Sequence, residues 1–178
     1  ARRPARPTYA EARAPQNDIR FYINTYRRDP VTRLNIAIIT AAEQQTMNYY
    51  LNVANLHDTE LGRKLYSEIA MIEEQHVTGY GSLSDPTSDM FECMVMHEYT
   101  ECYLYWSCYN DETDERIKQL WLMHFEEELS HLHAAVRLLE KYNGKCWEQL
   151  FPEGGEFPQL LAFSEQKSYI REVLKSVR

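Results

Sequence analysis

The sequence EEQH at residues 73–76 has a counterpart, ELSH, 55 residues later at 128–131. Each of these Glu-x-x-His motifs is preceded at a distance of 30 residues by a single glutamate, Glu43 in the first case and Glu98 in the second. Glutamate and histidine three positions apart lie on one helix face, so both can reach the same metal ion. A carboxylate-bridged two-metal centre in a four-helix bundle uses one glutamate from each of two helices and one Glu-x-x-His from each of the other two.

The repeated pattern therefore predicts a two-metal centre with six ligands from four helices. Four glutamates facing one core would repel each other strongly without cations, so a metal-free bundle explains them poorly. Carboxylates can bridge two cations and imidazole can bind each one terminally, a mixture that suits iron or manganese. The predicted ligands are Glu43, Glu73, His76, Glu98, Glu128 and His131.

Apolar residues at helical spacing predict an all-α protein with four long helices. Asp29-Pro30 and Asp85-Pro86 are typical of helix starts, with an N-cap followed by proline at the first helical position. The helices are expected over about residues 30–55, from a cap at Asp58 to about 78, over about 86–109, and from Asp111 or Asp114 to 143. No segment alternates with a period of two for long enough to indicate a strand.

The expected organisation is a basic N-terminal arm at 1–29, a di-metal four-helix bundle at 30–144, and a C-terminal tail at 145–178. Short helices are expected near 16–26 in the arm and over 164–177 in the tail. The chain of 178 residues is long enough to bury one core. These boundaries describe a four-helix bundle with an additional arm and tail.

Charge and composition exclude several classes of function. The net charge is -8, made up of +4 over residues 1–31 and -12 over the rest, and an acidic body argues against nucleic acid binding. No apolar run has the roughly 18–20 residues of a membrane helix, and no signal-peptide pattern opens the sequence. The four cysteines form no C-x-x-C pair, which argues against a rubredoxin-type module. A cytoplasmic protein with reduced thiols is expected.

The order Glu, Glu-x-x-His, Glu, Glu-x-x-His resembles the ferritin-like di-iron carboxylate proteins over about residues 31–142. It is most similar to rubrerythrins, because Glu98 is followed three residues later by Glu101. The resemblance implies two iron ions per site, with Glu101 as an additional ligand and His76 as its alternate when the redox state changes. It also implies a peroxidase that reduces hydrogen peroxide to water. The rubredoxin domain is missing, so an external electron donor such as a rubredoxin-like protein is expected.

Two tyrosines extend the repeat, because Tyr50 and Tyr105 each follow the single glutamate by seven residues, two turns along the same face. They are candidate catalytic residues that donate hydrogen bonds to ligands or to bound oxygen species, or supply a transient radical. The alternative is a core tyrosine whose hydroxyl is satisfied by a neighbouring carboxylate. His124, one turn before Glu128, is a candidate to orient a ligand or a core histidine.

The short connection between the second and third helices predicts a homodimer. The return along the bundle needs about 27 Å, and the linker at 79–85 spans about 20–25 Å when fully extended. An exchange, in which each centre uses two helices from each chain, removes this strain. The alternative is a later start of the third helix, capped by Ser88 or Asp89, which lengthens the linker.

Three other functions remain open at this point. A ferroxidase or iron-storage protein would oxidise ferrous ions with dioxygen and pass them on. A manganese or mixed-metal oxidase or catalase would use the same ligands. A non-catalytic metal-binding module would use the basic arm to dock to a partner. The sequence does not choose between hydrogen peroxide and dioxygen as the oxidant.

Overall fold

The computed structural model describes residues 29–162 and 167–176, and the part it describes is helical without strands. The all-α prediction is confirmed. The arm at 1–28 and the helix expected near 16–26 lie outside the described residues. No described helix has the length and apolar character needed to cross a lipid bilayer. The helices are α1 (Pro30–Leu56), α2 (Glu60–Gly81), α3 (Met90–Asp111), α4 (Glu115–Asn143) and α5 (Lys167–Ser176), with a 3₁₀ turn at Trp147–Gln149.

Side-chain caps set most of the helix starts. Asp29 caps α1 by accepting from the backbone N–H of Val31 at 3.0 Å, with Pro30 at the first helical position, as predicted. The cap of α2 is Thr59 and not Asp58, and its hydroxyl accepts from the N–H of Gly62 at 3.1 Å.

The second hairpin shows the expected cap and stop signals. Asp114 caps α4, which ends at Gly144 with a φ of 64°. The tail helix, expected over 164–177, is described as α5, and residues 163–166 and 177 lie outside the described part.

The predicted start of α3 at Pro86 is wrong. The carboxylate of Asp85 accepts from the N–H and hydroxyl of Thr87 at 2.9 and 2.6 Å, which makes a turn and not a helix. Asp89 and Glu92 then form a capping box, so α3 begins at Met90. This later start matches the alternative with a cap at Asp89. The connection over residues 82–89 is therefore longer than expected, and its length alone does not require helix exchange.

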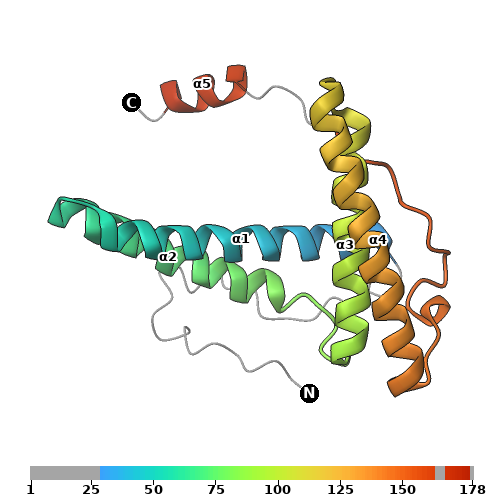
Figure 1. Cartoon of the computed structure of the whole chain (residues 1–178). Helices are drawn as coiled ribbons and strands as arrows, with labels where there is room; N and C mark the ends of the chain where they lie inside the picture. The colour runs from blue at the N-terminus through green and yellow to red at the C-terminus, as the bar shows by residue number, and fades with distance from the viewer. Residues whose placement is uncertain (1–28, 163–166, 177–178) are drawn as a thin grey trace.

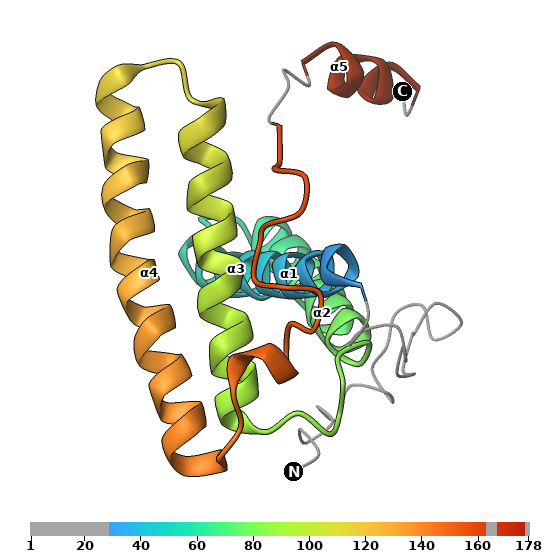
Figure 2. The same cartoon turned by 90° about the vertical axis from the view of Figure 1, so that its right-hand side faces the viewer.

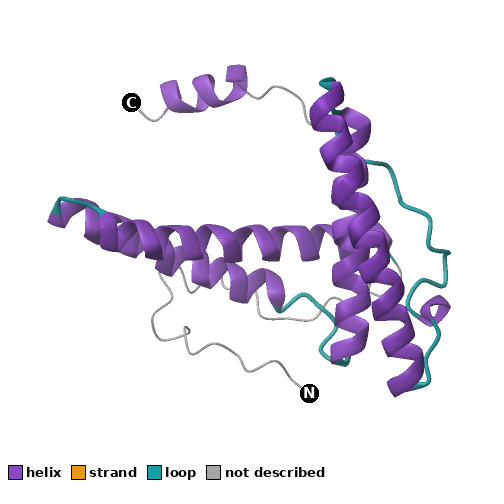
Figure 3. Ribbon diagram, viewed as in Figure 1, coloured by secondary structure: helices purple, strands orange, loops and turns teal. Residues whose placement is uncertain are grey.

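The four long helices form two antiparallel hairpins, the first hairpin (α1–α2) and the second hairpin (α3–α4). The first hairpin lies across the second and not alongside it, as Figures 1 and 2 show from two directions and Figure 3 shows by secondary structure. Between the hairpins, the contacts are concentrated where the start of α1 meets α3. Within the described part of one chain, the helices do not close into the four-helix bundle that the sequence predicted.

The main core lies where the start of α1 meets the second hairpin and the tail. Leu34 is buried in one cluster with residues of α3, α4 and the tail, including Val95, Leu139 and Phe151. On α1, Leu34 is nine residues before Glu43, and nine residues at about 100° each place the two side chains on opposite faces. The first hairpin is therefore attached through the face of α1 that is opposite the predicted ligand.

The tail segment 144–162, here called the strap, covers the side of α3 that faces away from α4 (Figure 2). The hydroxyls of Tyr99 and Tyr103 donate to the carbonyls of Glu156 and Gln159 at 3.0 and 2.8 Å, and the N–H of Leu161 donates to the Ser107 hydroxyl at 3.2 Å. These bonds satisfy backbone groups of an irregular segment against a buried helix face.

Arg33 connects the strap to α1. Its guanidinium donates to the carbonyl of Leu150 and to the carboxylate of Glu153, and it lies 4.8 Å from the ring centre of Phe151. The side chain is buried, so this ion pair is screened from solvent. Arg33 and Leu34 together hold α1, the strap and α3 in one unit.

We expect Leu34→Ala to lower the free energy of unfolding by about 2–5 kcal/mol, because Leu34 is 1% exposed and its loss leaves a cavity. Leu56→Ala is the matched control on the same helix, since Leu56 is 80% exposed and its loss should change stability by less than about 0.5 kcal/mol. Urea unfolding followed by circular dichroism measures both. Equal effects of the two substitutions would contradict the core described above.

Candidate metal centre

The first hairpin brings three of the predicted ligands together. The Nδ1 atom of His76 lies 3.2 Å from a carboxylate oxygen of Glu73 on the same helix and 3.3 Å from one of Glu43 on α1. One ligand atom from each of the three residues falls within 4.8 Å of the others. Glu43, Glu73 and His76 are called the first triad below.

The second hairpin repeats this arrangement with Glu98, Glu128 and His131, called the second triad. The Nδ1 atom of His131 lies 2.9 Å from Glu128 and 3.9 Å from Glu98, and the ligand atoms again fall within 4.8 Å of one another. The six predicted ligands are thus divided into two groups of three, one in each hairpin. They do not form one six-ligand site within the chain, because the hairpins cross and do not lie side by side.

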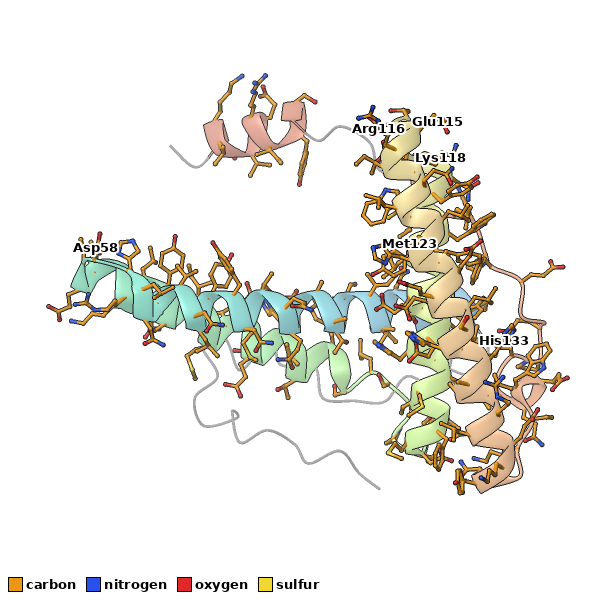
Figure 4. The ribbon with its side chains drawn as sticks, in the orientation of Figure 1. Asp58, Glu115, Arg116, Lys118, Met123 and His133 are labelled. Carbon is orange, nitrogen blue, oxygen red and sulfur yellow. The ribbon has the colours of Figure 1, made fainter. Side chains whose placement is uncertain are left out.

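The 55-residue repeat extends beyond the ligands. The N-caps Thr59 and Asp114 occupy equivalent positions, so α2 and α4 begin in register. Tyr50 stacks on Tyr66 with ring centres 5.9 Å apart, and at the equivalent positions Tyr105 stacks on Trp121 at 6.1 Å. The hairpin tips also correspond, with Asp58 and Glu115 labelled at their ends in Figure 4. The two hairpins thus carry N-caps, ring pairs and triads at positions 55 residues apart.

The ring stacking of Tyr50 on Tyr66 and of Tyr105 on Trp121 was not predicted from the sequence. The sequence predicted the two tyrosines as candidate site residues but not their stacking partners Tyr66 and Trp121, which lie at equivalent positions of the 55-residue repeat. His124 lies against the ring of Tyr105, with centres 5.3 Å apart, and its Nδ1 lies 3.2 Å from Glu127 and not from a triad residue. Its expected role in orienting a ligand is therefore not seen.

Glu101 lies one turn beyond Glu98 on α3 and is half-buried, but it does not belong to the second triad. Its equivalent in the first hairpin is Thr46, whose hydroxyl donates to backbone carbonyls of its own helix, including that of Glu43 at 3.0 Å. The additional carboxylate is thus present on the second hairpin and replaced by a hydroxyl on the first. The two hairpins differ at this position.

In each triad, burial and a neighbouring carboxyl group raise the pKa of one glutamate. Burial, and then the neighbouring carboxyl of Glu43, raise the pKa of Glu73. Burial and the carboxyl of Glu128 raise the pKa of Glu98 in the same way. One turn beyond Glu98, burial raises the pKa of the Cys102 thiol to about 12, so this cysteine stays protonated at neutral pH in the metal-free protein. Paired carboxylates that resist ionisation together are stabilised when a cation binds between them.

Each triad suits one divalent cation. Two carboxylates and one imidazole are donors that iron and manganese accept, and three protein ligands leave positions open on the ion. His76 and His131 are 44% and 62% exposed, so both triads lie at the surface of the chain. Two triads facing each other would supply the full set of six ligands for two cations.

Comparisons of the chain with protein-family models, curated proteins and solved structures found no match in any of the three. The resemblance to rubrerythrins therefore remains a prediction from the residues. The support for a function comes from the two triads, in each of which the ligand atoms lie within 4.8 Å of one another.

We expect a raised pKa for His131 in the metal-free protein, because the Glu128 carboxylate accepts a hydrogen bond from the protonated ring. A raised folded-state pKa stabilises the fold below the unfolded value of about 6.5, and this contribution is lost as pH rises through the folded value. Proton NMR of the ring should give a midpoint above 6.5, and Glu128→Gln should lower it. A midpoint at or below 6.5 would contradict this ion pair.

Proposed function

We propose that this protein is a non-haem di-iron oxidoreductase of the rubrerythrin-like type, which reduces hydrogen peroxide to water. The observation that carries this proposal is the pair of equivalent triads, each with two carboxylates and one imidazole within 4.8 Å. Two triads facing each other in a four-helix arrangement give the ligand set of a di-iron carboxylate centre. Manganese is the alternative occupant, because the same donors accept it.

Charge balance supports a pair of divalent ions. Four ionised glutamates carry a charge of -4, which two ferrous ions neutralise, so a closed centre would hold no excess charge in its reduced form. Oxidation of both ions would add two positive charges to the centre. Glu101, half-buried one turn from Glu98, supplies a fifth carboxylate that can offset part of that charge. This is the reason to assign Glu101 a role in the reaction and not in binding alone.

When bound, the pair of ferrous ions supplies two electrons, which with two protons convert one hydrogen peroxide into two waters. An electron donor such as a rubredoxin-like protein returns the two electrons. The chain itself contributes a half-buried acidic site with open positions, where peroxide can approach. It also contributes Tyr50 and Tyr105, each two helix turns along from the single glutamate of its triad.

Tyr105 is suited to donate a hydrogen bond near the second triad. Burial, and then the charges of Glu101 and Glu128, raise its pKa, so its hydroxyl keeps its proton at neutral pH. Tyr50 occupies the equivalent position in the first hairpin, and we assign it the same role. Tyr50 stacks on Tyr66 and Tyr105 on Trp121, and these contacts limit the movement of both rings.

Stopped-flow mixing of the anaerobic diferrous protein with hydrogen peroxide, and separately with dioxygen, tests this function. We expect oxidation by peroxide to be faster by orders of magnitude, with a donor-dependent return to the reduced form. Faster oxidation by dioxygen, with turnover of many irons per site, would support the ferroxidase or iron-storage alternative. Metal binding without either reaction would support the non-catalytic module.

We expect Glu101→Gln to leave the metal content unchanged and to slow peroxide reduction about 10–100-fold, because a carboxylate that offsets new positive charge is removed. Glu126→Gln is the matched control, since Glu126 is exposed and lies on the opposite side of α4 from Glu128. Elemental analysis and single-turnover kinetics measure the two effects. Unchanged turnover in Glu101→Gln would exclude the rubrerythrin-like reaction.

A further inference from the structure

The two triads of one chain face away from each other. On α1, Leu34 is packed against the second hairpin and lies half a turn around the helix from Glu43. On α3, Ser107 is fully buried under the strap and lies nine residues after Glu98, again on the opposite face. The contact between the described parts of the chain thus uses the backs of both hairpins. The opposite faces, which carry the triads, are called the ligand faces. Among the described residues, the histidines of the first and second triads on these faces are 44% and 62% exposed, so the ligand faces are accessible to another molecule.

Each ligand face is exposed and flanked by apolar side chains. Leu65 on α2 and Leu120 on α4 are 55% and 49% exposed, and each lies eleven residues before the histidine of its motif. Ile72 and Ile117, also exposed, lie on the same two helices. Exposed apolar groups around a polar centre are typical of an interaction surface. The equivalence of Leu65 and Leu120 shows that both hairpins present the same kind of surface.

We propose that the ligand face of the first hairpin binds the ligand face of the second hairpin of another copy of this chain, and the reverse. The resulting homodimer contains two four-helix centres, each completed by a triad from each chain. The partner is thus a second copy, and the site is incomplete without it. This inference rests on the proposed metal centre for the cations that hold the two triads together.

Closure favours this reciprocal pairing over pairing of like hairpins. Each chain presents two ligand faces, and reciprocal pairing uses all four faces of two chains around one two-fold axis. Pairing of first hairpins with each other would leave the second hairpins free to bind further chains. Pairing of like hairpins therefore gives an open, chain-like assembly unless its geometry closes a ring.

Charge also favours the pairing of unlike hairpins. The first hairpin, residues 30–81, carries three basic and six acidic side chains, a net charge of -3. The second, residues 90–143, carries four basic and eleven acidic side chains, a net charge of -7. Coulomb repulsion is proportional to the product of the two charges. Two contacts between a first hairpin (-3) and a second hairpin (-7) therefore repel less than one contact between two first hairpins together with one contact between two second hairpins. The unlike pairing therefore avoids the most unfavourable contact.

Co-expression of two variants with different affinity tags tests the pairing. In one variant all three residues of the first triad are changed to glutamine, and in the other all three of the second triad. Glutamine preserves the size of the glutamates and removes their mutual repulsion. Doubly tagged heterodimers are loaded with manganese(II), and electron paramagnetic resonance measures the fraction of manganese in magnetically coupled pairs. The wild-type protein carrying both tags is the reference.

Reciprocal pairing predicts no coupled pairs in either variant alone, because every centre lacks one triad. The heterodimer should recover half of the wild-type signal, because one of its centres receives both intact triads and the other receives neither. If each variant alone keeps half of the signal, like hairpins pair with each other and the proposal is wrong. If the signal is not recovered, or no heterodimer can be isolated, the partner does not complete the site.

The mass of the assembly is an independent measurement. Light scattering of the metal-loaded wild type should give twice the chain mass of 21.1 kDa. Leu65→Glu should shift it towards the monomer, because a charge is placed on the ligand face. Leu56→Glu is the matched control, since Leu56 is exposed away from that face and its substitution should leave the dimer intact. A wild-type monomer that holds coupled manganese pairs would overturn the proposal.

Failure of the pairing and failure of the proposed function give different results. A heterodimer with recovered coupled pairs that does not react with peroxide would refute the peroxidase function and leave the pairing in place. Peroxide reduction by a monomer would refute the pairing and leave the peroxidase function in place.

Discussion

The buried contact at the start of α1 decides the arrangement of the molecule. Leu34 fills the core between α3, α4 and the strap, and Arg33 beside it binds the strap through Leu150 and Glu153. Because both residues lie at the start of a 27-residue helix, they fix the whole first hairpin by one end. The rest of α1 and α2 extends away from the core. The direction in which the first triad faces follows from this one attachment.

The two hairpins combine local stability with an unfavourable concentration of charge. Capping side chains begin each long helix, and antiparallel packing holds each hairpin together. Within each hairpin the triad places two half-buried carboxyl groups side by side, at a cost that the raised pKa values of Glu73 and Glu98 reflect. A fold that accepts this cost twice, at equivalent positions, is well suited to hold cations.

The sequence predicted the helices and the members of each triad, because both depend on local spacing. Glu73 and His76 lie on one face of α2 by helix geometry alone, and Glu43 is brought to them by the tight turn before Thr59. The start of α3 was mispredicted because Asp85-Pro86 and Asp89 are both plausible starts, and the capping box with Glu92 decided the competition. The start of α3 is set by the two reciprocal hydrogen bonds between Asp89 and Glu92, and residue spacing alone does not show that these bonds form.

The crossing of the hairpins was not predictable from periodicity. It depends on the strap, whose hydrogen bonds to Tyr99, Tyr103 and Ser107 occupy the back of α3, and on Arg33, which reads as an ordinary surface residue in the sequence. A pattern of inward-facing residues shows which side of a helix is apolar or ligand-bearing. It does not show which other helix, or which chain, that side meets.

The difference between Thr46 and Glu101 makes the proposed centre asymmetric. A centre assembled from two identical hairpins would be symmetric, and its two ions would share one environment. Here one ion would lie nearer a spare carboxylate and the other nearer a hydroxyl already engaged with its own helix. Because the two hairpins are separate stretches of one polypeptide, each can change alone, so the two ions can differ in reduction potential and exchange rate while sharing one ligand pattern.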